Sequence, residues 1–252
     1  MTEPTGRARP DQAAEVDPFG PELISGVERV RSAITALRRH PSNRTGWPRT
    51  AAAASVRAAR ASAALDGAPL ALDLDAASVA DPVLAGALRV AAAIGSLSAV
   101  WARAPMQALA KLHTLAAADL VPPDDLGRPR SAPAVGGRLA GLAELATSDR
   151  WPAPVQIALV HGEVLAIAPF GVADGVVARA AARLTMISTG LDPAGLGVPE
   201  VAHLRSGPRY REFAAGYRTG APAAVDEWIN EVCRCLVLGA KEGVSIADSA
   251  GS

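Results

Sequence analysis

The chain has 252 residues, half of them hydrophobic, which is enough to bury one substantial core or one core with a small N-terminal unit. Its 25 basic and 25 acidic residues give a formal net charge of zero, so composition predicts neither a nucleic-acid nor a membrane partner. The sequence shows no apolar run of the roughly 20 residues that a membrane helix needs, and no signal peptide. We therefore expect a cytoplasmic protein.

Helix-forming residues dominate the composition. Alanine is abundant while aromatic residues make up only 4% of the chain, which favours helices packed closely through small side chains. Strand-forming stretches are scarce, so the expected fold class is all-α. Cys233 and Cys235 stand two apart in a helical pattern, where neighbours point to different faces and cannot easily form a disulfide.

The first 49 residues divide into two predicted parts. Residues 1–20 are polar, contain three prolines and lack periodicity, so we expect a disordered tail. Residues 21–49 form an N-terminal helical arm, with apolar residues at helical spacing from Leu23 to Leu37. The stretch HPSNRTGWP that follows is rich in breakers and predicts a loop.

The main domain is predicted to span 50–241. An alanine-rich helix begins near Thr50 and ends at Asp66-Gly67, where glycine suits a left-handed terminating residue. A proline- and glycine-dense stretch at 121–137 predicts a surface loop, and 242–252 a flexible C-terminus. The remaining helices are expected at 78–102, 105–118, 137–146, 154–167, 175–189 and 223–239.

The most informative segment runs from His161 to Arg179. An apolar helix stops at a Pro-Phe turn, and after a short loop a new helix begins near Gly175. The start of a helix favours a bound anion through its free N–H groups and its dipole. On local features alone, an ordinary joint between two helices explains this segment more simply.

This segment resembles the signature of the Fic (Fido) family. In that signature a helix ending in His-Pro-Phe leads into a loop reading x-acid-Gly-Asn-Gly-Arg, and a second arginine follows three residues later. Pro169, Phe170, Gly175 and Arg179 match in register. The similarity extends over about residues 50–240 and implies a Fic-like helical domain.

A second motif supports the resemblance. Ser62, Asp66 and Gly67 resemble the family's inhibitory-helix motif, in which a serine or threonine stands four residues before a glutamate; here aspartate replaces the glutamate. In the family the inhibitory acid pairs with the second arginine, so the resemblance predicts that Asp66 lies close to Arg179. That pair could lock an inhibited geometry, or simply staple the helix to the core.

The sequence departs from the family signature at the positions that carry chemistry. Ala168 stands in place of the histidine that accepts a proton from the target hydroxyl, and Val172 in place of the acid that holds Mg²⁺. Val176 replaces the first arginine, Ala173 a loop glycine, and Asp174 the loop asparagine. An aspartate there would repel a phosphate unless protonated or paired.

These losses predict a catalytically inactive Fic-like protein, a pseudoenzyme that acts as a binding or regulatory module on an unknown protein partner. The flap hairpin that presents the target is expected to be short or absent, because the stretch after Gly127 contains prolines and lacks β-branched residues. No cofactor or metal is expected. The alternative is a divergent Fic-type transferase that moves a nucleotidyl or phosphate group from ATP, with Mg²⁺, to protein hydroxyl groups. The composition suggests a bacterial source, and the oligomeric state stays open.

Other candidate residues are interpreted as structural. His161 lies about two helical turns before Ala168, roughly 10 Å along the axis, so we interpret it as a partly buried helix histidine and not as a replacement base. His40, His113 and His203 are isolated in sequence and lack zinc-site spacing. The tryptophans are interpreted as packing anchors: Trp47, Trp101, Trp151 and Trp228.

Overall fold

The computed structural model describes residues 20–70 and 80–251, which are helical and contain no strand. This confirms the predicted all-α class. The predicted tail at 1–20 lies, but for Gly20, outside the described residues. The helices are α1 (Pro21–Arg39), α2 (Pro41–Leu65), α4 (Pro82–Trp101), α5 (Pro105–Ala116), α6 (Pro133–Thr147), α7 (Ala153–Ile167), α8 (Asp174–Ser188), α9 (Pro199–Ser206), α10 (Pro208–Arg218) and α11 (Pro222–Gly251), with a 3-10 turn at Pro123–Asp125.

Proline marks the beginning of most of these helices. The first helical position lacks an intrahelical partner for its N–H group, and the fixed φ of proline suits the helix, so proline there costs nothing. The same residue that breaks a helix in its interior therefore starts one here. The helices that begin with proline are α1, α2, α4, α5, α6, α9, α10 and α11.

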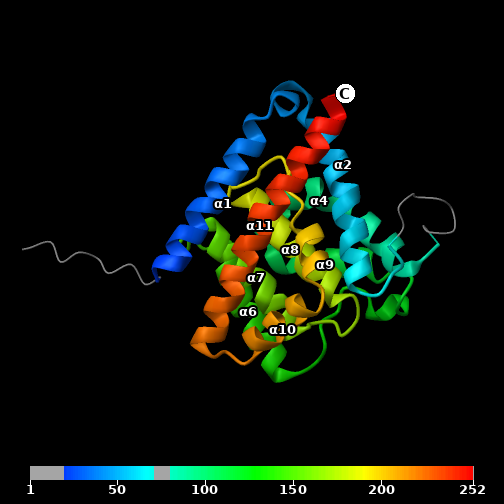
Figure 1. Cartoon of the computed structure of the whole chain (residues 1–252). Coiled ribbons are helices and arrows are strands. Elements are labelled where there is room, and N and C mark those ends of the chain that lie inside the picture. Colours follow the sequence, from blue (N-terminus) through cyan, green and yellow to red (C-terminus); the bar gives the residue numbers. More distant parts are fainter. Residues whose placement is uncertain (1–19, 71–79, 252) are drawn as a thin grey trace, which may run out of the picture.

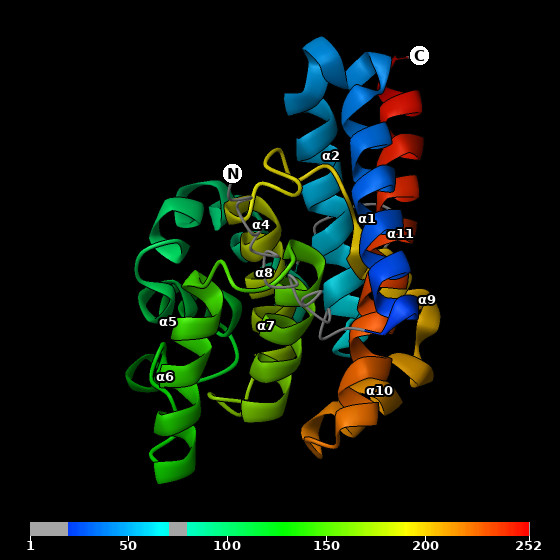
Figure 2. The same cartoon turned by 90° about the vertical axis from the view of Figure 1, so that its left-hand side faces the viewer.

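The helices form two groups around a central pair, α7 and α8 (Figures 1 and 2). Figure 2 shows α5 and α6 on one side, α4 beside the central pair, and α1, α2 and α11 on the other side, where they form a pillar that extends beyond the rest of the molecule. One apolar core lies among α4, α5, α7 and α8, and a second joins α1, α7 and α11. The central pair, which contributes to both cores, is also the pair that holds the candidate site.

Close contact between α4 and α5 depends on a glycine. A Cβ atom added to Gly86 would overlap the carbonyl of Ala116. Only glycine lets the two backbones approach this closely. The alanine-rich composition thus produces the tight helix packing that the sequence predicted.

Among the boundaries that differ from the sequence predictions, three have a clear physical reason. The predicted loop HPSNRTGWP is helical, because Pro41 starts α2 and the carbonyl freed by Pro48 belongs to a residue exposed to water, Arg44. Helix α6 begins at Pro133, inside the predicted loop 121–137. Helix α11 continues to Gly251 where a flexible end was predicted from 242, because Ile246 and Ala247 are buried.

One helix contradicts the expectation that no apolar stretch is long enough to cross a membrane. Helix α4 has 20 residues, and an 18-residue window within it has a mean hydropathy of 1.8, so by length and composition it could cross a membrane. In the fold its apolar face packs into the core through Leu84, Val90, Ile94 and Trp101. The helix packs against α2, α5 and α8, and 33% of its 18-residue apolar window is buried in the fold.

Candidate functional site

The site is built on the loop between α7 and α8. Helix α7 ends at Ala168, which has φ 43°, and Ala173 before α8 has φ 57°. Both alanines adopt the left-handed conformation, which costs a residue with a Cβ atom roughly 1–2 kcal/mol. Gly171 between them, with φ 81°, adopts positive φ without that cost. The loop therefore keeps a backbone suited to glycine at a position, 173, where the chain has alanine.

The loop's own carboxylate binds its backbone amides. The N–H of Phe170 donates to Oδ1 of Asp174 over 3.0 Å, and the N–H of Gly171 donates to Oδ2 over 2.7 Å. Burial raises the pKa of Asp174, and these two hydrogen bonds and the charge of Arg130 oppose that rise. Asp174 thus turns back onto the two amides and is paired within the loop. The sequence predicted its repulsion of phosphate but not this partner.

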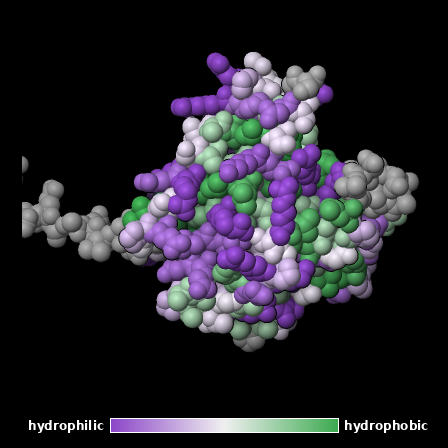
Figure 3. Space-filling view, viewed as in Figure 1, coloured by the Kyte–Doolittle hydropathy of each residue, from purple (hydrophilic) through white to green (hydrophobic). Residues whose placement is uncertain are grey.

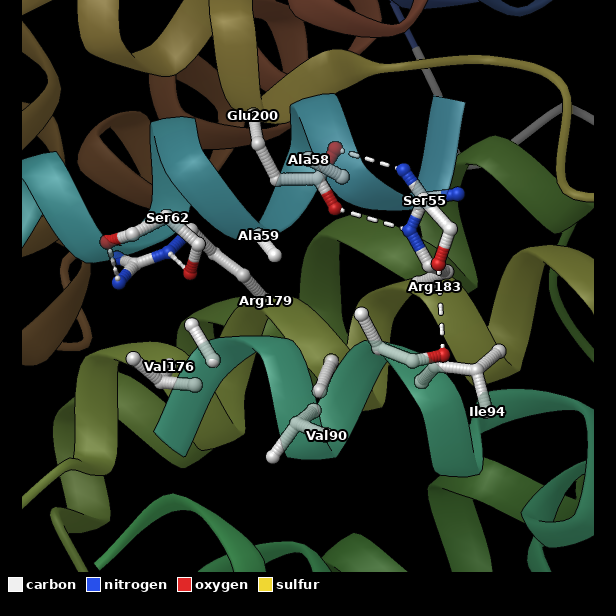
Figure 4. A pocket seen from close by; sticks show the side chains of 13 residues that line it. Ser55, Ala58, Ala59, Ser62, Val90, Ile94, Val176, Arg179, Arg183 and Glu200 are labelled. Carbon is white, nitrogen blue, oxygen red and sulfur yellow. Dashed lines mark hydrogen bonds and ion pairs between the residues drawn. The ribbon is translucent and has the colours of Figure 1, made fainter. Parts of the chain in front are cut away.

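The predicted proximity of Asp66 and Arg179 is confirmed. The Nη2 atom of Arg179 lies 2.8 Å from Oδ1 of Asp66. Arg179 also donates from Nε to the hydroxyl of Ser62 over 2.7 Å and from Nη2 to the Ser62 carbonyl over 3.0 Å. Figure 4 shows Arg179 reaching from α8 to Ser62 on α2. Every one of these bonds fastens α2 to α8.

The end of α2 places Asp66 over the start of α8. Gly67 has φ 98°, and the N–H groups of Gly67 and Ala68 donate to the carbonyls of Ala64 and Ala63. This is the glycine-terminated helix end that the sequence predicted. A Cβ atom added to Gly175 would collide with the Asp66 carboxylate, so the acid lies directly against the first turn of α8.

The buried guanidinium of Arg179 is held by negative and polar groups. Its side chain is only 3% exposed, whereas that of Asp66 is 25% exposed. Burial disfavours the charge, but Asp66 and Tyr210 outweigh it and raise the pKa of Arg179. Arg179 therefore stays charged, and its Nε and Nη2 groups bond to Ser62 and Asp66.

A second arginine ties the stretch after the 3-10 turn to the loop. Arg130 donates from Nη2 to the carbonyls of Ala168 and Ile167, over 2.7 and 3.0 Å, and its own N–H donates to the carbonyl of Pro169 over 2.7 Å. Pro169 is buried and Phe170 stacks on His113 with ring centroids 4.0 Å apart. Residues 126–132 contain no strand, and Arg130 straps this stretch to the loop, a contact that the sequence did not predict.

The substituted positions carry apolar side chains in two environments. Val172 is 37% exposed on the loop, and Ala168 is half-buried. Val176 is buried and lines a cavity of about 30 Å³ between α2, α4 and α8, together with Val90, Ser62 and Arg179 (Figure 4). Small-molecule pockets are typically ten times larger or more. No loop position from 168 to 173 supplies a proton acceptor or a metal-binding carboxylate.

Mg²⁺ and a nucleotide, which the resemblance implies, do not fit these residues. The side chain at 172 cannot bind an ion, and the carboxylates of Asp174 and Asp66 lie where phosphate charge would have to approach. The negative charges of these carboxylates and of a phosphate would repel each other strongly in a half-buried site. The polar groups of the site are instead satisfied by one another.

Behind Arg179 lies a buried histidine cluster that the sequence did not reveal. The ring centroids of His161 and His203, which are 42 residues apart in sequence, lie 5.1 Å apart. His161 bonds to the hydroxyl of Tyr210 over 2.8 Å, while the Nδ1 atoms of both histidines are buried without a partner among the described residues. Burial lowers the pKa of His203 to about 4. Three helices meet here, α7, α9 and α10, so no local sequence signal could have found the cluster.

No protein-family model and no curated protein sequence matches the chain. Solved structures do match it. A Fic family protein from Desulfovibrio desulfuricans is similar with a TM-score of 0.74 and 20% identity, over 91% of this chain and 76% of that one. Fic-1 from C. elegans is similar with a TM-score of 0.65 and 14% identity, over 91% of this chain and 71% of that one. The chain therefore has the fold of the Fic family proteins.

Proposed function

We propose that this protein is a Fic-fold pseudoenzyme, without nucleotide-transfer activity, that acts as a binding or regulatory module. The observation that carries the proposal is the pair of hydrogen bonds from the Phe170 and Gly171 amides to the Asp174 carboxylate. A phosphate that used these amides would have to displace an anion that belongs to the chain itself. Because that anion is covalently attached, its effective concentration at the amides is far above that of a free ligand.

The chemistry of the loop supports the same conclusion. A general base must place a lone pair within reach of the proton that it removes, and Ala168 has none. The backbone carbonyl of Ala168 is already bound by Arg130. Without a base, an ion anchor at 172 or a free arginine, little remains that could stabilise a transition state.

The ion pair between Asp66 and Arg179 supports a module in which α2 and α8 stay fixed relative to each other. It holds the last turn of α2 over the loop, and Arg179 directs its Nε and Nη2 groups at α2 and none of its described bonds at the loop. The interaction has the form that the family resemblance assigns to an inhibitory helix. In this chain it acts as a permanent clasp, because nothing catalytic is left for it to inhibit.

A labelling experiment tests the proposal. The full chain is incubated with ATP radiolabelled at the α- or γ-phosphate, with Mg²⁺, alone and with a bacterial lysate as a source of target proteins. We expect no incorporation into the chain or into lysate proteins. Labelling that depends on the chain and disappears on Arg179→Lys would establish the alternative, a divergent Fic-type transferase.

Thermal unfolding with ADP supplies the matched control. Wild-type protein should show no shift of its unfolding temperature, since only a bound ligand stabilises the folded state. Asp174→Asn keeps the shape of the side chain and removes its charge. A shift of the unfolding temperature in that variant alone would show that the Asp174 carboxylate prevents ADP from binding. A shift of the wild-type protein contradicts the proposal.

A further inference from the structure

The turn between α1 and α2 concentrates positive charge that the neutral balance of the whole chain hides. From Arg29 to Leu65 the sequence contains eight arginines and no acidic residue. Four of them lie close to the turn: Arg38 and Arg39 in the last turn of α1, and Arg44 and Arg49 in the first turns of α2. All four are exposed, and within the described part of the chain their side chains form no ion pair or hydrogen bond.

An exposed tryptophan lies among these arginines. Trp47 is 47% exposed, so its predicted role as a packing anchor was wrong. Residues 44–49 are exposed without interruption, and six consecutive helical residues cover every side of a helix. This part of α2 therefore projects beyond the body of the protein. Hydrophilic side chains extend from this end of the molecule in Figure 3, where Figure 1 places the turn.

We propose that this tip, defined as Arg38, Arg39, Arg44, Trp47 and Arg49, docks on the surface of an anionic lipid bilayer. Guanidinium groups bind phosphate through paired hydrogen bonds, and basic side chains near a bilayer are attracted by its negative surface potential. An indole ring prefers the interface between headgroups and acyl chains. The tip combines both features, and the proposal does not depend on the proposed function.

The shape of the tip favours a bilayer over a nucleic acid. Single-stranded nucleic acids are held in a basic groove that follows the backbone, whereas here the cations surround a projecting helix. A planar membrane contacts the part of a protein that projects furthest. The acid near the turn, Asp248, bonds to His40 over 3.0 Å. Acidic groups more than a Debye length away, about 8 Å at physiological salt, contribute little.

The test is sedimentation of the full chain with vesicles. Vesicles of phosphatidylcholine alone are compared with vesicles that also contain phosphatidylserine, at low and at physiological salt. We expect binding only where phosphatidylserine is present, and weaker binding at higher salt. Each arginine near the surface contributes about fivefold to the partition coefficient, so Arg44→Gln with Arg49→Gln should lower it about 25-fold.

A matched variant distinguishes binding through the tip from an effect of the protein's overall charge. Arg211→Gln with Arg218→Gln removes two exposed arginines from α10, which lies at the other end of the molecule (Figure 2), and should leave binding unchanged. Quenching of tryptophan fluorescence by brominated lipid should occur in the wild type and be largely lost in Trp47→Phe, because Trp101 and Trp228 are buried and Trp151 is only partly exposed.

Two results would overturn the proposal. One is equal sedimentation with neutral and anionic vesicles, or equal loss of binding in both arginine pairs. The other is binding to a single-stranded or duplex oligonucleotide without binding to vesicles, which would assign the tip to nucleic acid. The altered side chains are exposed, so urea unfolding should show that every variant retains the stability of the wild type.

Discussion

The guanidinium of Arg179 lies 2.8 Å from the carboxylate of Asp66 and joins the end of α2 to the first turns of α8. The cation is buried and the side chain of its acid is 25% exposed, so the pair is shielded from solvent more than a surface ion pair is. Such a pair is costly to break from one side, because the remaining charge stays buried without compensation. The clasp between α2 and α8 is therefore a structural element as well as a feature of the site.

Asp66→Asn should lower the free energy of unfolding by about 3 kcal/mol, because it leaves the Arg179 cation buried without its counter-charge. Urea unfolding monitored by circular dichroism measures the change. The control is Asp119→Asn, which breaks the exposed pair with Arg89 and should cost less than about 1 kcal/mol. Equal losses in the two variants would show that the clasp does not stabilise the fold.

Gly86→Ala should lower the free energy of unfolding by about 3 kcal/mol or more, because the new methyl group overlaps the carbonyl of Ala116 and forces α4 from α5. Gly95→Ala on the same helix meets nothing within 4 Å and should stabilise the protein by about 0.5–1 kcal/mol. Each variant adds one methyl group to the same helix. If both stabilise, the close approach of α4 and α5 is wrong.

His203 should make the protein less stable in acid. Burial lowers its pKa from 6.5 to about 4 in the folded state, so between these values the unfolded chain binds a proton that the folded chain does not. The free energy of unfolding has its full value above pH 6.5 and decreases by about 3 kcal/mol as the pH falls toward 4. Urea unfolding across this range should give a flatter dependence for His203→Gln than for the wild type. Parallel curves would mean that His203 is not buried in neutral form.

Arg130→Ala should loosen the loop that precedes α8. The change removes the bonds from the guanidinium to the carbonyls of Ala168 and Ile167 and should cost about 1–2 kcal/mol. Hydrogen exchange followed by mass spectrometry should be faster at residues 168–173. Arg128→Ala removes a neighbouring exposed arginine and should leave these amides unchanged. Unchanged exchange in Arg130→Ala would show that the strap does not hold the loop.

The sequence predicts a helix whose apolar residues recur at a regular spacing, such as α1, and a helix that is a mostly apolar run, such as α7. The sequence does not predict whether a given proline begins a helix or ends one. Pro41, Pro199 and Pro208 each start a helix, but in the sequence they have the same appearance as breakers, so the first turns of α2 and all of α9 and α10 were not delimited. Whether a proline begins or ends a helix depends on the packing that follows it.

Contacts of the site could be predicted where a sequence motif identified both residues. They could not be predicted where the two residues meet only through tertiary packing. The contact between Asp66 and Arg179 followed from the motif resemblance. The turn of Asp174 back onto the loop amides depends on the positive φ at Ala173, and the strap of Arg130 on a contact across 38 residues. No residue pattern encodes these contacts locally, because tertiary packing determines them.

Calorimetric titration of the full wild-type chain with ATP and Mg²⁺ tests the central claim, that the chain's own carboxylates occupy the anion site. We predict no saturable heat at nucleotide concentrations up to about 1 mM, which corresponds to a binding free energy weaker than about 4 kcal/mol. Saturable binding in the micromolar range, weakened by Arg179→Lys, would contradict the account.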